Sequence, residues 1–223
     1  MEKGTIHGVI FDQDGLLFDT ERLSAVAWKL AGDELGFYLE ESFLKTIRGA
    51  NASDAARRFQ ETFGDRFDFW KLRARKQEHF LRILRENEMP VKPGARELLC
   101  YLRQEGYKVA LATASAREYS MENLRLAGIE EFFQEIITGD MVGEAKPNPE
   151  IFLKAAKALK EEPARCLVLE DSLNGVEAGL RGGFVTIMVP DLTEPDENLR
   201  GRVNRVCASL FEVKDWLIKE QKQ

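Results

Sequence analysis

The sequence predicts an α/β fold, a doubly wound parallel sheet that an all-helical insertion interrupts. Three observations predict it. An apolar, β-branched run at residues 5–11 ends abruptly in acidic residues. Residues 19–90 show helical spacing and no strand-like alternation, whereas from residue 91 strand-like runs alternate with helical segments, which is typical of a parallel sheet. We therefore expect a core of residues 1–18 and 91–223 and a helical domain of residues 19–90.

The inserted segment contains four predicted helices. Leu23, Ala27, Leu30 and Leu35 follow helical spacing from about residue 20, and Gly36 is a C-terminal stop. Leu23, Ala27, Leu30 and Trp28 indicate helix packing. The three further helices are expected at residues 41–46, 53–63 and 68–88.

The core segment after Gly94 alternates in type. Its predicted helices are 95–105, 117–127, one with Asn148 as N-cap and Pro149 as first residue, one that Ser172 caps and Gly182 ends, and 210–219. Its predicted strands are 108–113, 136–137, 165–169, 185–189 and a short one near Val206. The first strand, residues 5–11, must join these across the insertion.

Composition and charge exclude several classes of protein. The chain has 223 residues, 44% of them hydrophobic, and a formal net charge of −6, which gives no general attraction for nucleic acid or anionic membranes. It has no apolar run of about 18 residues, and we expect no signal peptide at its N-terminus. The three cysteines are widely spaced and read as reduced thiols. We expect a cytoplasmic monomer without nucleic-acid or membrane partners.

Two acids follow the first strand. Asp12 and Asp14 stand one residue apart at its C-terminal end, before Gly15. Ligands bind at that edge of an open α/β sheet, and two carboxylates so close together need a cation to remain ionised. The alternative is turn chemistry, because Asp-Gly is a common turn dipeptide.

Other polar residues follow the later strands. Thr113 and Ser115 can donate to a phosphate or cap a helix. Lys146 precedes a proline, which holds it extended, although an isolated loop lysine is usually solvated. Glu170 and Asp171 end another strand and could simply favour the next helix N-terminus.

Taken together, these groups predict a binding site at one edge of one sheet. Several acids with one lysine and a hydroxyl suit a divalent cation and a phosphate. Oxygen ligands favour Mg²⁺, which commonly binds phosphate-bearing substrates. With only two histidines in the chain, the chemistry rests on carboxylates, lysine and hydroxyls.

The sequence resembles the haloacid dehalogenase (HAD) superfamily, in the branch of β-phosphoglucomutase and its phosphatase relatives with a helical, C1-type cap. Four motifs carry the resemblance in order: DQDGLLFDTE at 12–21, LATAS at 111–115, KPNPEIF at 146–152 and EDSLNG at 170–175. Gln13 stands where this family usually has Met. The resemblance implies a Rossmann-like core with the cap inserted after the first motif.

The resemblance also implies a role for each motif. Asp12 would attack phosphorus and form an aspartyl-phosphate, and Asp14 would protonate the leaving alkoxide and then activate water. Mg²⁺ would be held by the Asp12 carboxylate, the Asp14 backbone carbonyl and Asp171, with Glu170 as ligand or water-mediated support. The phosphoryl oxygens would be held by Thr113, the backbone at Ala114, Ser115 and Lys146. Arg48 is the candidate in the cap for contacting the substrate.

Three departures from the family pattern bear on the reaction. β-Phosphoglucomutase has a histidine where this chain has Ser24, an arginine near Ala52 and a lysine at Ala116; Arg48 and Arg117 lie close by but out of register. These differences favour a Mg²⁺-dependent phosphatase of a small phosphorylated metabolite, such as a sugar phosphate. The alternatives are a phosphosugar mutase and a binding protein that kept the fold, and the intact motif residues disfavour the latter.

Overall fold

The computed structural model describes residues 5–47, 50, 52–64, 68–86 and 88–220. The chain divides into two compact units, Met1–Phe18 with Pro90–Gln223 and Asp19–Met89. The predicted second boundary, after Pro90, lies one residue later. No helix of the described residues is both long enough and apolar enough to span a membrane.

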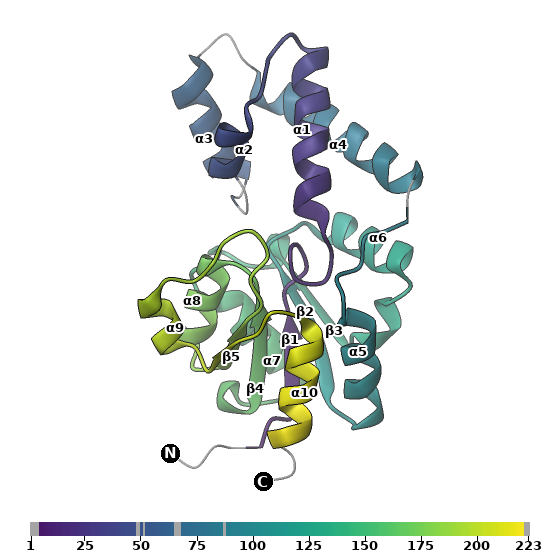
Figure 1. The fold of residues 1–223 in the computed structure, drawn as a ribbon, viewed down its shortest axis with the longest axis vertical. Coiled ribbons are helices and arrows are strands. Elements are labelled where there is room, and N and C mark those ends of the chain that lie inside the picture. Colours follow the sequence, from purple (N-terminus) through teal and green to yellow (C-terminus); the bar gives the residue numbers. More distant parts are fainter. Residues whose placement is uncertain (1–4, 48–49, 51, 65–67, 87, 221–223) are drawn as a thin grey trace. The chain divides into compact units, whose positions relative to one another are not determined.

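The first unit contains the predicted doubly wound sheet (Figure 1). Among the described residues, six parallel strands lie in the spatial order β3-β2-β1-β4-β5-β6. Their bounds are β1 Gly8–Phe11, β2 Lys108–Thr113, β3 Glu135–Thr138, β4 Cys166–Glu170, β5 Val185–Met188 and β6 Arg205–Val206. All six predicted strands are present, but β1 is shorter than residues 5–11, and β3, β4 and β5 differ from their predicted bounds by one residue at one or both ends. The strand order reverses at β1, which places β1 between β2 and β4.

Helices cover both faces of this sheet. On one face α7 (Glu150–Leu159) packs on β1, β2 and β3, and α8 (Leu173–Arg181) packs on β4 and β5. α5 (Ala95–Gln104) packs on β2 and on α10 (Leu210–Glu220), and in Figure 1 α10 lies in front of the sheet. The remaining α-helices in the described part of this unit are α6 (Arg117–Ala127), which contacts β3, and α9 (Glu197–Arg202). The predicted helix starting at Pro149 begins at Glu150 instead, but the Asn148 side chain still accepts a hydrogen bond from the Glu150 amide.

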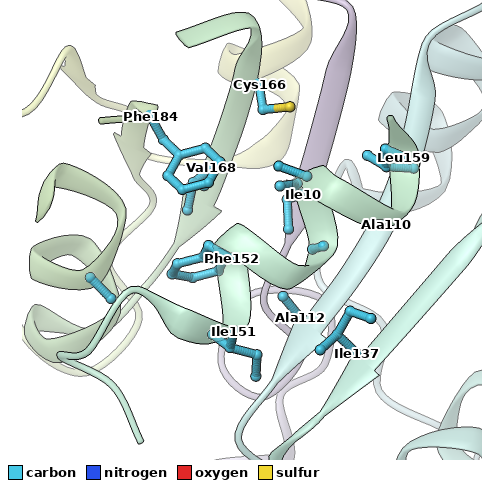
Figure 2. Close-up of a cluster of buried hydrophobic side chains, with 13 residues drawn as sticks. Ile10, Ala110, Ala112, Ile137, Ile151, Phe152, Leu159, Cys166, Val168 and Phe184 are labelled. Carbon is cyan, nitrogen blue, oxygen red and sulfur yellow. The ribbon is translucent and has the colours of Figure 1, made fainter. Parts of the chain in front are cut away.

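The core on the α7 face is formed by apolar side chains from the strands and from α7. Ile10, Ala110 and Val168 of the strands meet Phe152 of α7, and the Phe152 ring lies edge-on to Phe184 (Figure 2). β1 is buried on both faces, as its continuous apolar run requires. The central strands are therefore a rigid base for whatever follows their carboxyl ends.

The second unit is helical, as predicted. Its helices are α1 Thr20–Glu34, α2 Glu41–Ile47, α3 Ala52–Phe63 and α4 Phe69–Glu86. Phe59 of α3 is fully buried, and its ring contacts Trp28, Phe43 and Phe69. The packing prediction for Trp28 agrees with these contacts, whereas that for Leu30 is wrong, because its side chain is exposed.

Candidate active site

Three neighbouring strands bring the predicted acids and hydroxyl to one edge of the sheet. Asp12 directly follows β1, Thr113 ends β2 and Glu170 ends β4. The Asp12 amide donates to the Leu169 carbonyl of β4 at 3.0 Å, which extends the ladder by one residue. The edge coincides with the reversal of strand order, where doubly wound sheets bind ligands.

Lys146 lies among these groups. Its Nζ donates to Asp12 Oδ1 at 2.5 Å, to Glu170 Oε1 at 2.8 Å and to the Ala112 carbonyl at 3.1 Å. The same ammonium lies 4.7 Å from the centre of the Phe152 ring. The lysine side chain is only 8% exposed, so the alternative of a solvated surface lysine is wrong. Burial alone would lower the pKa of Lys146, but Asp12 and Glu170 raise it above its usual value.

The loop that carries Lys146 is stabilised by its own polar residues. The Glu150 carboxylate accepts hydrogen bonds from the Gly143 and Glu144 amides at 3.0 and 2.9 Å and pairs with Lys154 at 2.7 Å. The Lys146–Pro147 peptide bond within the loop is cis. The Lys154 side chain, followed by the two amides, lowers the pKa of Glu150 to about 2.

This lowered pKa predicts a pH dependence. A carboxyl whose pKa falls on folding stabilises the fold above its ordinary pKa, and that contribution is lost as pH falls from 4.5 to about 2. Glu150→Gln should therefore lower the urea midpoint near neutral pH, and the deficit should shrink as pH falls toward about 3. The exposed Glu118→Gln is the control. A deficit for Glu150→Gln that stays constant with pH would contradict this assignment.

Glu170 is held firmly by the turn that follows it. Its Oε2 accepts from the Asp171 and Ser172 amides and the Ser172 hydroxyl at 2.8–2.9 Å, while Oε1 accepts from Lys146. The Ser172 hydroxyl also accepts from the Gly175 amide at 3.1 Å, so the predicted Ser172 cap is confirmed. This geometry favours Glu170 as support for Lys146 and the turn.

Gly175 is needed because Glu170 occupies the space of a side chain. A Cβ built on Gly175 would lie 1.7 Å from Glu170 Oε1. Gly175→Ala should displace the carboxylate, destabilise the protein by about 1–3 kcal/mol in thermal or urea unfolding and lower activity at least about tenfold. Gly201→Ala is the matched control, since nothing lies within 4 Å of its added Cβ. This variant should lower neither the stability nor the activity. Equal behaviour of the two variants would contradict the prediction.

Three carboxylates lie close enough to share a cation. Asp12, Glu170 and Asp171 each offer an oxygen within 4.8 Å of the others. Burial raises the pKa of Asp12 to about 7, against the opposing effect of Lys146. Burial, with the charges of Glu170 and Asp12, also raises the pKa of Asp171 well above its ordinary value. Full ionisation of the three carboxyl groups would thus place more negative charge in the cluster than Lys146 compensates, and a bound cation such as Mg²⁺, which prefers oxygen ligands, would offset that charge.

The backbone after Asp14 lies beside this cluster. Gly15 has φ +89°, and a Cβ there would lie 2.2 Å from Asp171 Oδ2. Only glycine permits so close an approach in the left-handed conformation. The Asp14–Gly15 peptide is therefore next to Asp171. The Asp-Gly dipeptide can thus both form a turn and belong to the site.

The hydroxyls after β2 line the same edge. Thr113 is buried, and its Oγ1 accepts from the Ser115 amide at 3.1 Å. Ser115 does not cap α6, because Ala116 holds the N-cap position without a side-chain bond. Its hydroxyl instead contacts Asp14 Oδ2 at 2.7 Å. Ala114 is exposed between them, and its carbonyl would lie 2.2 Å from a Cβ at Gly139.

The candidates outside the core motifs are placed differently. Arg48 lies outside the described residues. Arg117 is exposed, and its guanidinium donates to the Ile136 carbonyl at 3.2 Å. In the helical unit, Ser24 lines a small pocket of about 50 Å³ together with five other residues: Glu21, Ala25, Trp28, Leu44 and Ile47.

Sequence reasoning missed Gly139 and Tyr119, and it gave no role to Gly175, although Gly175 lies in the fourth motif. Gly139 and Gly175 permit close approaches that only the folded chain defines. Tyr119, on the first turn of α6, places its hydroxyl 3.3 Å from Asp14 Oδ1. Tyr119 lies outside all four motifs, and nothing in the sequence links it to Asp14.

Fold and site together define a class of proteins, those with a doubly wound α/β core and a cluster of carboxylates around a buried lysine at the carboxyl edge of the sheet. The sequence profile of one family, described as haloacid dehalogenase-like hydrolase, matches residues 6–183. The chain belongs to this family.

Relatives and solved structures narrow the class. The chain is 32% identical over 186 residues to a phosphorylated carbohydrates phosphatase of Thermotoga maritima, covering 82% of this chain and 84% of that one. The crystal structure of CbbY from Rhodobacter sphaeroides in complex with phosphate is similar, with a TM-score of 0.80, 29% identity and coverage of 94% and 96%. A β-phosphoglucomutase of Clostridium difficile shares the fold, with a TM-score of 0.81, 24% identity and coverage of 97% and 96%. The protein is a phosphoric monoester hydrolase of this family.

Proposed function

We propose that the protein is a Mg²⁺-dependent phosphatase that hydrolyses a small phosphorylated metabolite, a sugar phosphate, through an aspartyl-phosphate on Asp12. The observation that carries the proposal is the contact of Lys146 with Asp12 at the carboxyl edge of the sheet. Asp12 is also one of the three carboxylates, with Glu170 and Asp171, that lie close enough to share a cation. The name of the Thermotoga maritima relative supports a phosphorylated carbohydrate as substrate.

The substrate's phosphoryl group binds to groups at the carboxyl edge of the sheet. Its oxygens are held by Lys146, by the Thr113 and Ser115 hydroxyls and by the backbone at Ala114. The residues that would hold Mg²⁺ are Asp12, the Asp14 carbonyl and Asp171, with Glu170 as ligand or support. When bound, the ion neutralises negative charge on the phosphoryl group.

The reaction then has two balanced steps. An Asp12 oxygen attacks phosphorus, the bond to the ester oxygen breaks, and Asp14 gives its proton to that leaving oxygen. Water next attacks phosphorus of the aspartyl-phosphate and gives a proton to Asp14, and the bond from phosphorus to Asp12 breaks. Inorganic phosphate leaves, and both carboxyl groups regain their starting states.

We also propose that the two parts of the chain have different roles. The core, residues 1–18 and 91–223, contains the groups that react, and the cap, residues 19–90, selects the substrate, with Arg48 as the candidate contact. The Ser24 pocket is a polar and aromatic site within that unit. A cytoplasmic monomer remains the expectation from composition.

The test is a panel of sugar, nucleotide and glycerol phosphates with p-nitrophenyl phosphate, in which both free phosphate and isomerised sugar are measured. We expect phosphate release with Mg²⁺, loss of release with EDTA and recovery on adding Mg²⁺ back. Acid-quenched protein should carry a phosphate adduct on the peptide that contains Asp12. Isomerisation faster than hydrolysis would identify a mutase instead, and no product across the panel would overturn the proposal.

A further inference from the structure

Three side chains converge on the Asp14 carboxyl group. The Ser115 hydroxyl contacts Oδ2 at 2.7 Å, the Tyr119 hydroxyl contacts Oδ1 at 3.3 Å, and the Gln13 amide nitrogen lies 3.5 Å from Oδ2. The two longer distances are of the kind that tighten when substrate binds. Both carboxyl oxygens are therefore engaged, by groups from three different segments of the core.

Tyr119 lies on a helix that is packed against the sheet. It lies on the first turn of α6, which packs against β3, and its side chain is half-buried. An aromatic side chain has only two rotatable bonds, so its hydroxyl is delivered at little entropic cost. Tyr119 thus contacts the candidate acid from a fixed element without being part of any of the four motifs.

Gln13 is a polar residue in a buried position. Its side chain is fully buried, and Oε1 has no hydrogen-bond partner among the described residues. An unsatisfied buried polar atom destabilises the fold, whereas an apolar side chain of similar shape would avoid that cost. The amide end that does have a neighbour faces Asp14, which indicates what the glutamine contributes.

We propose that Tyr119 and Gln13 are positioning residues that hold the Asp14 carboxyl group in place for proton transfer, an inference that rests on the proposed function. General acid catalysis contributes about 10²–10⁴-fold only when the acid is correctly placed. Tyr119 donates to Oδ1 and the Gln13 amide donates to Oδ2, and a carboxyl oxygen can accept a hydrogen bond in both protonation states. The Asp14 proton passes to the ester oxygen as the phosphorus–oxygen bond breaks, and the attacking water later returns a proton to Asp14.

Ser115 is the exchangeable partner in this arrangement. A serine hydroxyl both donates and accepts, so Ser115 can release Oδ2 and donate to the phosphoryl group instead. Tyr119 and Gln13 have no place among the proposed phosphate-binding groups. Their effect must therefore appear through Asp14.

The test compares kcat/KM for two substrates that differ in their need for an acid. p-Nitrophenolate leaves without a proton, whereas the alcohol of the fastest sugar phosphate in the panel needs one. Tyr119→Phe should lower kcat/KM for the sugar phosphate about tenfold and that for p-nitrophenyl phosphate by no more than about twofold. Gln13→Met should shift the same ratio in the same direction.

Two controls make the result specific. Tyr101→Phe removes a tyrosine hydroxyl that pairs with Tyr107, away from the carboxyl edge, and should change neither substrate. In an Asp14→Asn background, Tyr119→Phe should have no further effect on the sugar phosphate, because there is no acid left to position.

Each outcome decides between the two proposals. Equal losses for both substrates, or a Tyr119→Phe effect that persists in full without Asp14, would overturn the positioning role and leave the phosphatase intact. Wild-type protein that releases phosphate from neither ester would overturn the proposed function and this inference with it. Thermal unfolding of each variant shows whether a loss reflects folding.

Discussion

Asp12→Asn is expected to lower the rate of phosphate release by a factor on the order of 10⁴–10⁶, since an amide cannot supply the attacking oxygen. Asparagine has nearly the same shape as aspartate, so Lys146 should still occupy its place beside position 12. Burial raises the pKa of Asp12 to about 7, and the amide removes this buried titratable group. The variant should therefore be at least as stable as the wild type in metal-free buffer.

The measurements are initial rates with p-nitrophenyl phosphate and urea unfolding of metal-free protein. Asp196→Asn is the matched control. Asp196 caps α9 by accepting from the Leu199 amide at 2.8 Å, and asparagine is an equally good cap. Its activity and stability should be unchanged. Activity of Asp12→Asn within about tenfold of wild type would rule out Asp12 as the nucleophile.

Lys146→Met should affect both activity and stability. Methionine fills similar space but removes the ammonium that contacts Asp12, Glu170 and the Ala112 carbonyl. Breaking a buried ion pair from one side costs about 3–5 kcal/mol, because the remaining charge is left uncompensated. Loss of a donor to the phosphoryl group should lower kcat by a further factor on the order of 10²–10³.

The stability loss should depend on pH with a definite sign. An acid whose pKa rises on folding destabilises the fold as pH rises from its ordinary value through its folded value, 3.8 to about 7 for Asp12. Without Lys146 the pKa of Asp12 rises further, so this loss extends to higher pH. The stability difference between the variant and the wild type, both metal-free, should be larger at about pH 8 than at about pH 5.

Lys108→Met is the control for removal of a lysine. Lys108 pairs with Glu161 at 2.6 Å, but its side chain is 45% exposed, so the loss should stay within about 1 kcal/mol and leave the rate unchanged. A Lys146→Met variant that matches Lys108→Met in both measurements would contradict the role assigned to Lys146.

Most of the fold could be predicted because its signals are local. The apolar run before Asp12, the alternation after residue 91 and caps such as Ser172 depend on neighbouring residues only. The spatial order of the strands could not be predicted, because β1 pairs with segments that are far away along the chain: Gly8 lies opposite Lys108 of β2 and opposite Cys166 of β4. Leu30 fitted the helical pattern and is exposed, because spacing defines a face but not whether anything covers it.

The residue types of the candidate site could likewise be assigned from the sequence. Acids, a hydroxyl and a lysine at strand ends indicate cation and phosphate chemistry wherever the edge brings them together. What each side chain contacts could not be assigned. Ser115 was equally suited to cap a helix, and only the backbone path that makes Ala116 the N-cap turns its hydroxyl to Asp14.

The sequence alone therefore determined which groups are delivered to the edge, because strand ends and motif order are properties of the chain. Only the tertiary structure decided how those groups are paired: Lys146 between Asp12 and Glu170, and Tyr119 beside Asp14. The physical reason is that charges and hydrogen bonds act over a few ångströms. Such distances between residues far apart in sequence exist only once the sheet has formed.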